Sequence, residues 1–234
     1  MAFDPWTQPR ERAEVLPGGS LESRGDVAAF MAKVYRWMAA GLGLTGVIAM
    51  AIASSDSMLH AVMPLFLPLI IGELILVFAF SRMVRTASFT TAAAMFLVYA
   101  ALNGVTFSVI LRIYTPESVA SVFFITAGAF GGMSVFGTVT KRDLSAWAGF
   151  LMMGLFGVII AGVVNIFVHS SPLNFIISCA SVVVFAGLTA WNTQQLRSLA
   201  SVGDDRLALS GALSLYLDFV NLFLSLLRLF GRRR

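Results

Sequence analysis

Two acidic residues, Glu73 and Asp218, stand inside long apolar stretches of this 234-residue sequence. Ionisable side chains at membrane depth are costly, so they usually face a bundle interior or water and mark a functional pathway. Asp218 also belongs to a polar stripe, because residues three or four apart share one helix face. The stripe consists of Gly211, Ser214, Asp218, Asn221, Ser225 and Arg228. This pattern predicts a polar helix face that points into the protein; the alternative is a seam that only fixes helix packing.

Few other residues in the sequence are suited to chemistry. The single cysteine, Cys179, lies in an apolar run, and the histidines His60 and His169 lie at predicted loop ends. The sequence has no Cys/His cluster with metal-ligand spacing, no nucleophile motif and no phosphate-binding glycine loop. We therefore expect a protein that is not an enzyme and has no cofactor.

The composition indicates which elements must position the two acids. Hydrophobic residues make up 58% of the chain and charged residues 12%, whereas a soluble domain carries about a quarter charged residues. Ten of the 28 charged residues fall within the first 36 positions, so the rest of the chain is poorer still in charge. The chain is therefore expected to be an integral membrane protein, which excludes a soluble enzyme, a nucleic-acid-binding module and a disordered chain.

Seven apolar runs follow one another, each close to the ~20 residues that span a bilayer as a helix. They are Trp37–Ala53, Val62–Phe80, Phe89–Leu111, Val119–Val139, Ala146–Val168, Leu173–Trp191 and Leu207–Phe230. We predict an all-α membrane bundle, since unpaired backbone groups cannot face lipid and no segment alternates like a barrel strand. Its polar stripe places Leu207–Phe230 in the middle. The expected organisation is a polar cytosolic tail (1–30), a seven-helix domain (31–231) and a basic end (232–234).

Basic residues predict the orientation, because Lys and Arg collect in cytoplasmic loops. They occupy the N-terminal tail and every second connection: Arg10, Arg12, Arg24, Lys33; Arg82, Arg85; Lys141, Arg142; Arg197, Arg206. The alternate connections hold only Arg112. We expect a multi-pass protein of the inner (plasma) membrane with a cytoplasmic N-terminus. The final arginines, 232–234, lie outside if the seventh run spans and inside if it re-enters, and the sequence leaves both open.

The stretch from Ala212 to Arg228, ALSLYLDFVNLFLSLLR, resembles the C-terminal signature of the Bax inhibitor-1 family, the transmembrane BAX inhibitor motif proteins. Weaker matches occur in the right order: Leu67-Pro68-Leu69 before Glu73, NGVTFS at 103–108, KRDLS at 141–145 and NIF at 165–167. The resemblance covers roughly Phe30 to Gly231, and the short tail and compact loops are similar to those of the bacterial branch.

The resemblance implies a seventh helix ringed by the other six, in a passive, pH-sensitive calcium leak channel gated by two aspartates. Asp218 matches the seventh-helix aspartate, whereas Asn192 replaces the aspartate of the sixth helix. Glu73 matches a glutamate that lines the calcium path. Arg82 and Arg85 flank the position of an arginine that pairs with the gate. Calcium is thus implied as the transported or bound ion, with Glu73 and Asp218 as its ligands.

Asn192 changes the chemistry expected of that gate. Two close carboxylates share a proton because both cannot ionise together. An asparagine does not repel a charge; its amide can donate a hydrogen bond to Asp218, and its oxygen is an acceptable calcium ligand. We therefore expect a weaker pH dependence than in relatives with both aspartates.

A second function class stays open beside the calcium leak. Through the same resemblance, the chain could be a non-conducting regulatory protein that modulates a membrane-bound AAA protease or another partner, with the N-terminal tail as a contact surface. An intramembrane enzyme has little support, because the membrane holds two candidate acids and no nucleophile–base pair. The expected partners are the lipid bilayer and calcium ions, not nucleic acid.

Overall fold

The computed structural model describes residues 19–84, 86–200 and 204–234, and these are almost entirely helical. Within them, seven helical segments are long and apolar enough to cross a membrane, which confirms the predicted all-α, seven-span architecture. The elements are α1 (Gly19–Ala53), α2 (Asp56–Val62), η1 (Met63–Leu65), α3 (Phe66–Met83), α4 (Phe89–Ile113), α5 (Pro116–Val139), α6 (Ser145–Val168), α7 (Ser171–Leu199) and α8 (Asp205–Phe230).

The second span is interrupted where the sequence predicted one run from Val62 to Phe80. A short helix, α2, is followed by the 3-10 turn η1 before α3 begins at Phe66. Pro64 lies in η1 and Pro68 in the first turn of α3. Proline supplies no backbone N–H and is tolerated mainly in a first helical turn, so each proline marks a new start.

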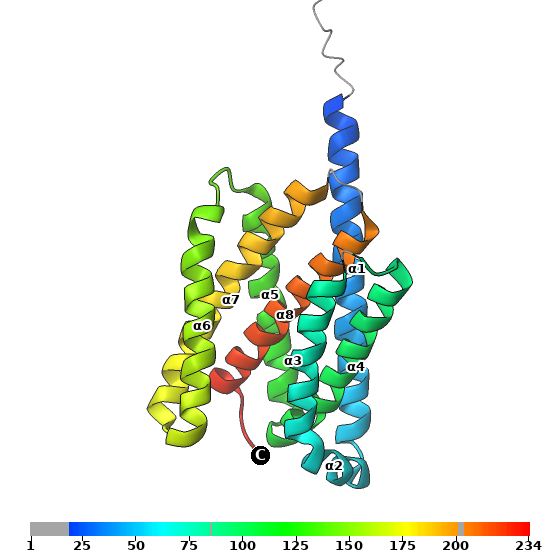
Figure 1. Cartoon of the computed structure of the whole chain (residues 1–234). Helices are drawn as coiled ribbons and strands as arrows, with labels where there is room; N and C mark the ends of the chain where they lie inside the picture. Colours follow the sequence, from blue (N-terminus) through cyan, green and yellow to red (C-terminus); the bar gives the residue numbers. More distant parts are fainter. Residues whose placement is uncertain (1–18, 85, 201–203) are drawn as a thin grey trace, which may run out of the picture.

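The first helix begins earlier than the predicted boundary at residue 30. α1 starts at Gly19 and continues without a break to Ala53, so residues 19–30 are helical. Its first turns extend beyond the rest of the bundle (Figure 1). The remainder of the predicted tail, residues 1–18, lies outside the described residues.

α8 is the central helix, as predicted, and runs obliquely through the bundle (Figure 1). It packs against α7, α1, α5 and α4, while α3 and α6 complete the surround by packing mainly on α4 and α7. Two thirds of the most apolar window of α8 is buried inside the protein, compared with none of that of the α2–α3 span. A helix with polar residues is thus shielded from lipid, and the apolar α3 and α6 face outward.

The chain crosses the bundle once more at α8, which is one continuous helix, long and apolar enough to span, and does not turn back. The residues after α8 pair with the α4–α5 connection: Thr115 N–H donates to the Arg232 carbonyl (2.9 Å), and Arg234 N–H donates to the Ile113 carbonyl (2.9 Å). The final arginines therefore lie at the end of the bundle opposite to the start of α1 (Figure 1). We call this the C-terminal end and the other the N-terminal end.

Candidate intramembrane acidic sites

The first site joins α7 to α8 through Asn192 and Asp218. The Asn192 side-chain amide donates to Asp218 Oδ2 at 2.7 Å, which confirms the hydrogen bond expected from the sequence. Asp218 is only 4% exposed, and Asn192 is half-buried. A buried carboxylate with a single neutral donor can change its protonation without breaking an ion pair. This arrangement suits a group that exchanges a proton or receives a cation.

The helices around this site are packed closely enough to fix it. A Cβ atom at Gly137 of α5 would overlap the backbone carbonyl of Ala190, two residues before Asn192. Gln194 also holds the α5–α6 connection, since its oxygen accepts from Leu144 N–H (2.8 Å) and its amide donates to the Arg142 carbonyl (2.9 Å). Both contacts set the position of α7, and with it the position of Asn192.

The polar stripe of α8 points only partly into the protein: Gly211, Asp218 and Ser225 are buried, Ser214 and Asn221 are half-buried, and Arg228 is exposed. Ser214, Asn221 and Ser225 each donate to the carbonyl one turn earlier, at 3.2, 2.8 and 2.7 Å. Such bonds satisfy a polar side chain within its own helix. Asp218 differs because its hydrogen-bond partner, Asn192, belongs to another helix. Within the stripe, Asp218 is therefore the residue that connects two helices.

The second site joins α3 to α4 through Glu73 and Thr106. The Thr106 hydroxyl donates to Glu73 Oε1 at 2.6 Å, and the Glu73 side chain is half-buried. On the same face of α4, Tyr99 packs edge-on to Tyr216 of α8 with ring centroids 5.8 Å apart. The Tyr216 hydroxyl in turn lies 2.7 Å from Thr45 Oγ1 of α1. Side chains that carry hydroxyl groups are thus found from the α3–α4 interface to α8 and α1.

The sequence analysis overlooked the two tyrosines and Thr45. A signal was present, because Tyr99, Asn103 and Thr106 recur at helical spacing in α4. Aromatic side chains in membrane spans are common as packing residues, so that spacing alone did not single out Tyr99 or Tyr216.

The two acids belong to different helix interfaces. Glu73 contacts α4, whereas Asp218 contacts α7. Among the described residues, no group of three or more His, Cys, Asp or Glu side chains could hold a metal ion. A calcium ion at either site would be held by one carboxylate together with neutral oxygens such as those of Asn192 or Thr106, and water.

The structure does not bring Arg82 to Asp218. Arg82 lies exposed in the last turn of α3, which packs on α4, whereas Asp218 faces α7. The salt bridges between described residues are Lys33–Asp205, Arg112–Asp56 and Arg206–Asp204, and none includes Asp218. Among the described residues, no salt bridge therefore joins Arg82 to Asp218, since Arg82 is exposed at the end of α3 and Asp218 is buried on the central helix α8. Arg85 lies outside the described residues.

Comparison with known proteins identifies the family. A family model described as "Inhibitor of apoptosis-promoting Bax1" matches residues 27–234. The chain is 41% identical over 236 residues to the inner membrane protein YbhL of Escherichia coli K12, covering 97% of this chain and 98% of that protein. It is 46% identical over 212 residues to an uncharacterized protein of Deinococcus radiodurans, covering 88% of this chain and 92% of the relative. With the match extending through all seven spans, the chain belongs to the Bax inhibitor-1 family of membrane proteins.

Proposed function

We propose that this protein is a pH-influenced, calcium-permeable leak channel of the inner membrane, with Glu73 and Asp218 lining the path and the N-terminus in the cytoplasm. One observation carries the proposal: both intramembrane carboxylates have neutral hydrogen-bond partners, and no salt bridge between described residues neutralises either. A carboxylate without a cation partner at membrane depth favours the binding of a divalent cation or a proton.

The two carboxylates would have different roles in this leak. Half-buried Glu73 supplies a hard oxygen ligand near the bundle surface, with the Thr106 oxygen beside it. Fully buried Asp218 and its bond to Asn192 close the α7–α8 interface and act as the gate. A change in the protonation of Asp218 alters this hydrogen bond, which gives pH an influence on opening. No covalent chemistry is required.

The location follows by extension from a relative. YbhL of Escherichia coli is named an inner membrane protein, and this chain matches 98% of its length. The N-terminal end of the bundle carries Lys33, Arg36, Lys141, Arg142 and Arg197, and this excess of positive charge favours the cytoplasmic side.

One observation favours the second candidate, a non-conducting regulator of a membrane-bound protease or another partner. The first turns of α1 extend beyond the other helices at the N-terminal end (Figure 1), and Gly25, Asp26, Ala28 and Ala29 are exposed there. A helix extending from the membrane offers a surface on which a cytosolic or membrane-bound partner can dock.

Calcium flux into proteoliposomes loaded with a calcium indicator distinguishes the two candidates. For a leak, wild-type protein admits calcium and Glu73→Gln lowers the rate about tenfold, since one charge-assisted contact is lost. The matched control is Glu117→Gln, which removes an exposed acid in the first turn of α5 and should leave flux unchanged. Wild-type vesicles that admit no more calcium than protein-free vesicles at any pH would overturn the leak and leave the regulator.

A further inference from the structure

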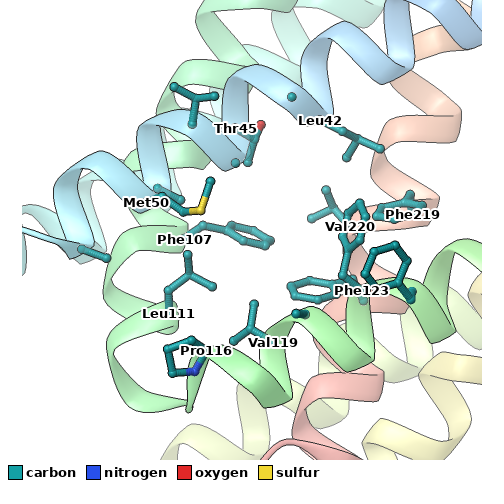
Figure 2. Close-up of a pocket in the computed structure, with 18 of the residues that line it drawn as sticks. Leu42, Thr45, Met50, Phe107, Leu111, Pro116, Val119, Phe123, Phe219 and Val220 are labelled. Carbon is teal, nitrogen blue, oxygen red and sulfur yellow. The ribbon is translucent and has the colours of Figure 1, made fainter.

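An apolar groove opens on the side of the bundle, and neither Glu73 nor Asp218 is among its lining residues. Its volume is about 830 Å³, and α1 and α5 form its two walls, with Phe107 of α4 and Phe219 of α8 between them (Figure 2). Val47 and Met50 of α1, and Phe124 of α5, are 62%, 62% and 72% exposed, so the groove is open sideways toward the bilayer.

The lining of this groove suits a hydrocarbon chain. The hydroxyls of Thr45 and Ser54 both donate to carbonyls of their own helix, at 2.9 and 2.8 Å, so they do not require a ligand. Along α1 the lining residues run from Ala39 to Ser54, which is about 22 Å at the rise of an α-helix. One leaflet of the hydrocarbon core is about 15 Å thick, so a single lipid chain fits within that length.

One end of the groove carries a positive charge that the fold holds in place. Arg234 is the one charged residue among the described residues that line it. Its backbone is fixed by the hydrogen bond to the Ile113 carbonyl and by the pairing of Arg233 with Tyr114. Arg232 N–H adds a bond to Ser118 Oγ at 2.8 Å. We call residues 231–234 the C-terminal strap.

The charge around this end is positive on balance. Arg112 is paired with Asp56 in the first turn of α2, and Glu117, in the first turn of α5, is the second acid near this end. The basic side chains at this end outnumber the acidic ones. They are the exposed arginines of the last turn of α8 and of the strap, namely Arg228, Arg232, Arg233 and Arg234. Guanidinium groups bind phosphate through parallel N–H donors, so this end suits an anionic headgroup.

We propose that the groove between α1 and α5 binds an anionic phospholipid, with an acyl chain along α1 and the phosphate group on Arg234. The apolar lining supplies affinity for the chain, and the strap supplies preference for the headgroup. A groove open to the bilayer is in contact with such lipids at all times, so the bound molecule is a lipid and not a soluble ligand. The groove shares α4 and α8 with the proposed calcium path, but neither Glu73 nor Asp218 lines it.

The test measures which phospholipids the detergent-purified full chain retains, after exchange with mixed phosphatidylglycerol and phosphatidylcholine, by mass spectrometry of the intact complex. Wild-type protein should retain phosphatidylglycerol in preference to phosphatidylcholine by about tenfold, as expected for one charge-assisted contact. Arg234→Gln should lose that preference, and Arg234→Lys should keep most of it.

A second variant tests the groove itself. Gly46 lines the groove, and a Cβ added there meets no atom within 4 Å, so Gly46→Phe should place its ring in the groove. It should abolish retention of both lipids. The matched control is Gly157→Phe on α6, where an added Cβ also meets nothing within 4 Å and the groove is distant.

Three results would overturn the proposal. They are wild-type protein that retains no lipid, equal retention of both lipids, and a loss of retention in Gly157→Phe as large as in Gly46→Phe. A dimeric wild type without lipid that becomes monomeric on Gly46→Phe would instead assign the groove to self-association.

Discussion

The two intramembrane acids occupy surroundings that differ in almost every physical respect. Asp218 lies on the central helix α8, nearly inaccessible, and faces α7, whose backbone at Ala190 closely approaches Gly137 of α5. Glu73 lies on peripheral α3, half-buried, beside Gly72, whose Cβ position is open. Each carboxylate accepts one short hydrogen bond, from Asn192 and from Thr106. The same chemical group is therefore held rigidly in one place and loosely in the other.

In the proposed leak, this difference would give the two carboxylates separate tasks. A rigid, dry carboxylate is sensitive to the loss of its partner, because no water replaces the hydrogen bond. A carboxylate at the half-exposed periphery can exchange partners at low cost. The first arrangement suits a gate and the second suits a transient ligand, so each prediction below compares the α7–α8 site with the α3–α4 site.

The largest expected effect comes from backbone packing. Gly137→Ala places a Cβ atom against the Ala190 carbonyl, and we expect it to lower the free energy of unfolding by about 2–3 kcal/mol or to prevent folding. Gly72→Ala, beside Glu73, should be neutral or stabilise by up to about 1 kcal/mol, because alanine is the better helix former. Denaturant unfolding in micelles measures both. Equal losses would contradict the difference in packing.

The next effect comes from removing the hydrogen-bond donor at each acid. Asn192→Leu leaves Asp218 without its partner and should cost about 2 kcal/mol, whereas Thr106→Val should cost less than about 1 kcal/mol. Adding Asp218→Leu to Asn192→Leu should recover most of the loss, since no polar group then stays unpaired. Unfolding of the three variants tests this directly. A double variant less stable than Asn192→Leu would show that Asp218 has partners other than Asn192.

Much of the fold was accessible from the sequence because lipid imposes simple rules. Each apolar run had to become a helix, and the polar stripe around Asp218 had to avoid lipid, which placed α8 at the centre. The break at Pro64 and the start of α1 at Gly19 were missed. Hydropathy indicates which residues are buried in lipid. It does not report whether an apolar run contains a 3-10 turn, or whether a helix continues beyond the apolar run.

The sites were only partly accessible for a related reason. The pairing of Asn192 with Asp218 followed from the resemblance to the Bax inhibitor-1 family, whereas the bond of Thr106 to Glu73 joined a helix pair that the sequence did not specify. Arg82 shows the limit most clearly. Its place near the end of α3 was known, but the direction in which it points depends on how α3 packs on α4. Side-chain direction between helices is a property of packing and is not encoded in spacing along one helix.

A third prediction tests the rigid site by adding charge. Asn192→Asp places a second carboxylate at hydrogen-bond distance from Asp218, and two such groups hold one proton between them. Calcium flux should then depend on pH more steeply than in the wild type. Thr106→Asp makes the matched change beside Glu73, where partial exposure weakens the interaction, and its effect should be smaller. Flux against pH in one lipid mixture compares all three proteins, and identical profiles for wild type and Asn192→Asp would show that this pair does not set gating.

The smallest effect concerns how the central helix is anchored at its N-terminal end. Asp204 caps α8, since its side chain accepts from Arg206 N–H at 2.8 Å, whereas the N-cap of α3, Leu65, offers no such bond. Asp204→Ala should therefore lower the free energy of unfolding by up to about 1 kcal/mol at neutral pH. The Arg206 side chain and backbone N–H hold the pKa of Asp204 below its usual value. A lowered carboxyl pKa means that the contribution is complete above the ordinary pKa near 4 and is lost as pH falls through the lower folded value.

The control for this cap is Asp204→Asn, because asparagine caps a helix and does not titrate. At neutral pH it should be close to wild type, lacking only the ion pair with Arg206, which is solvent-screened and worth little. As the pH falls toward 3, wild type should lose stability relative to Asp204→Asn. The difference in stability between Asp204→Ala and Asp204→Asn should stay constant over the same pH range. If wild type instead became more stable relative to Asp204→Asn in acid, the role of the charged cap would be contradicted. The stability change caused by Leu65→Ala, at the uncapped start of α3, should not depend on pH. The central helix α8 would then differ from the peripheral α3 in the capping of its first turn as well as in its burial.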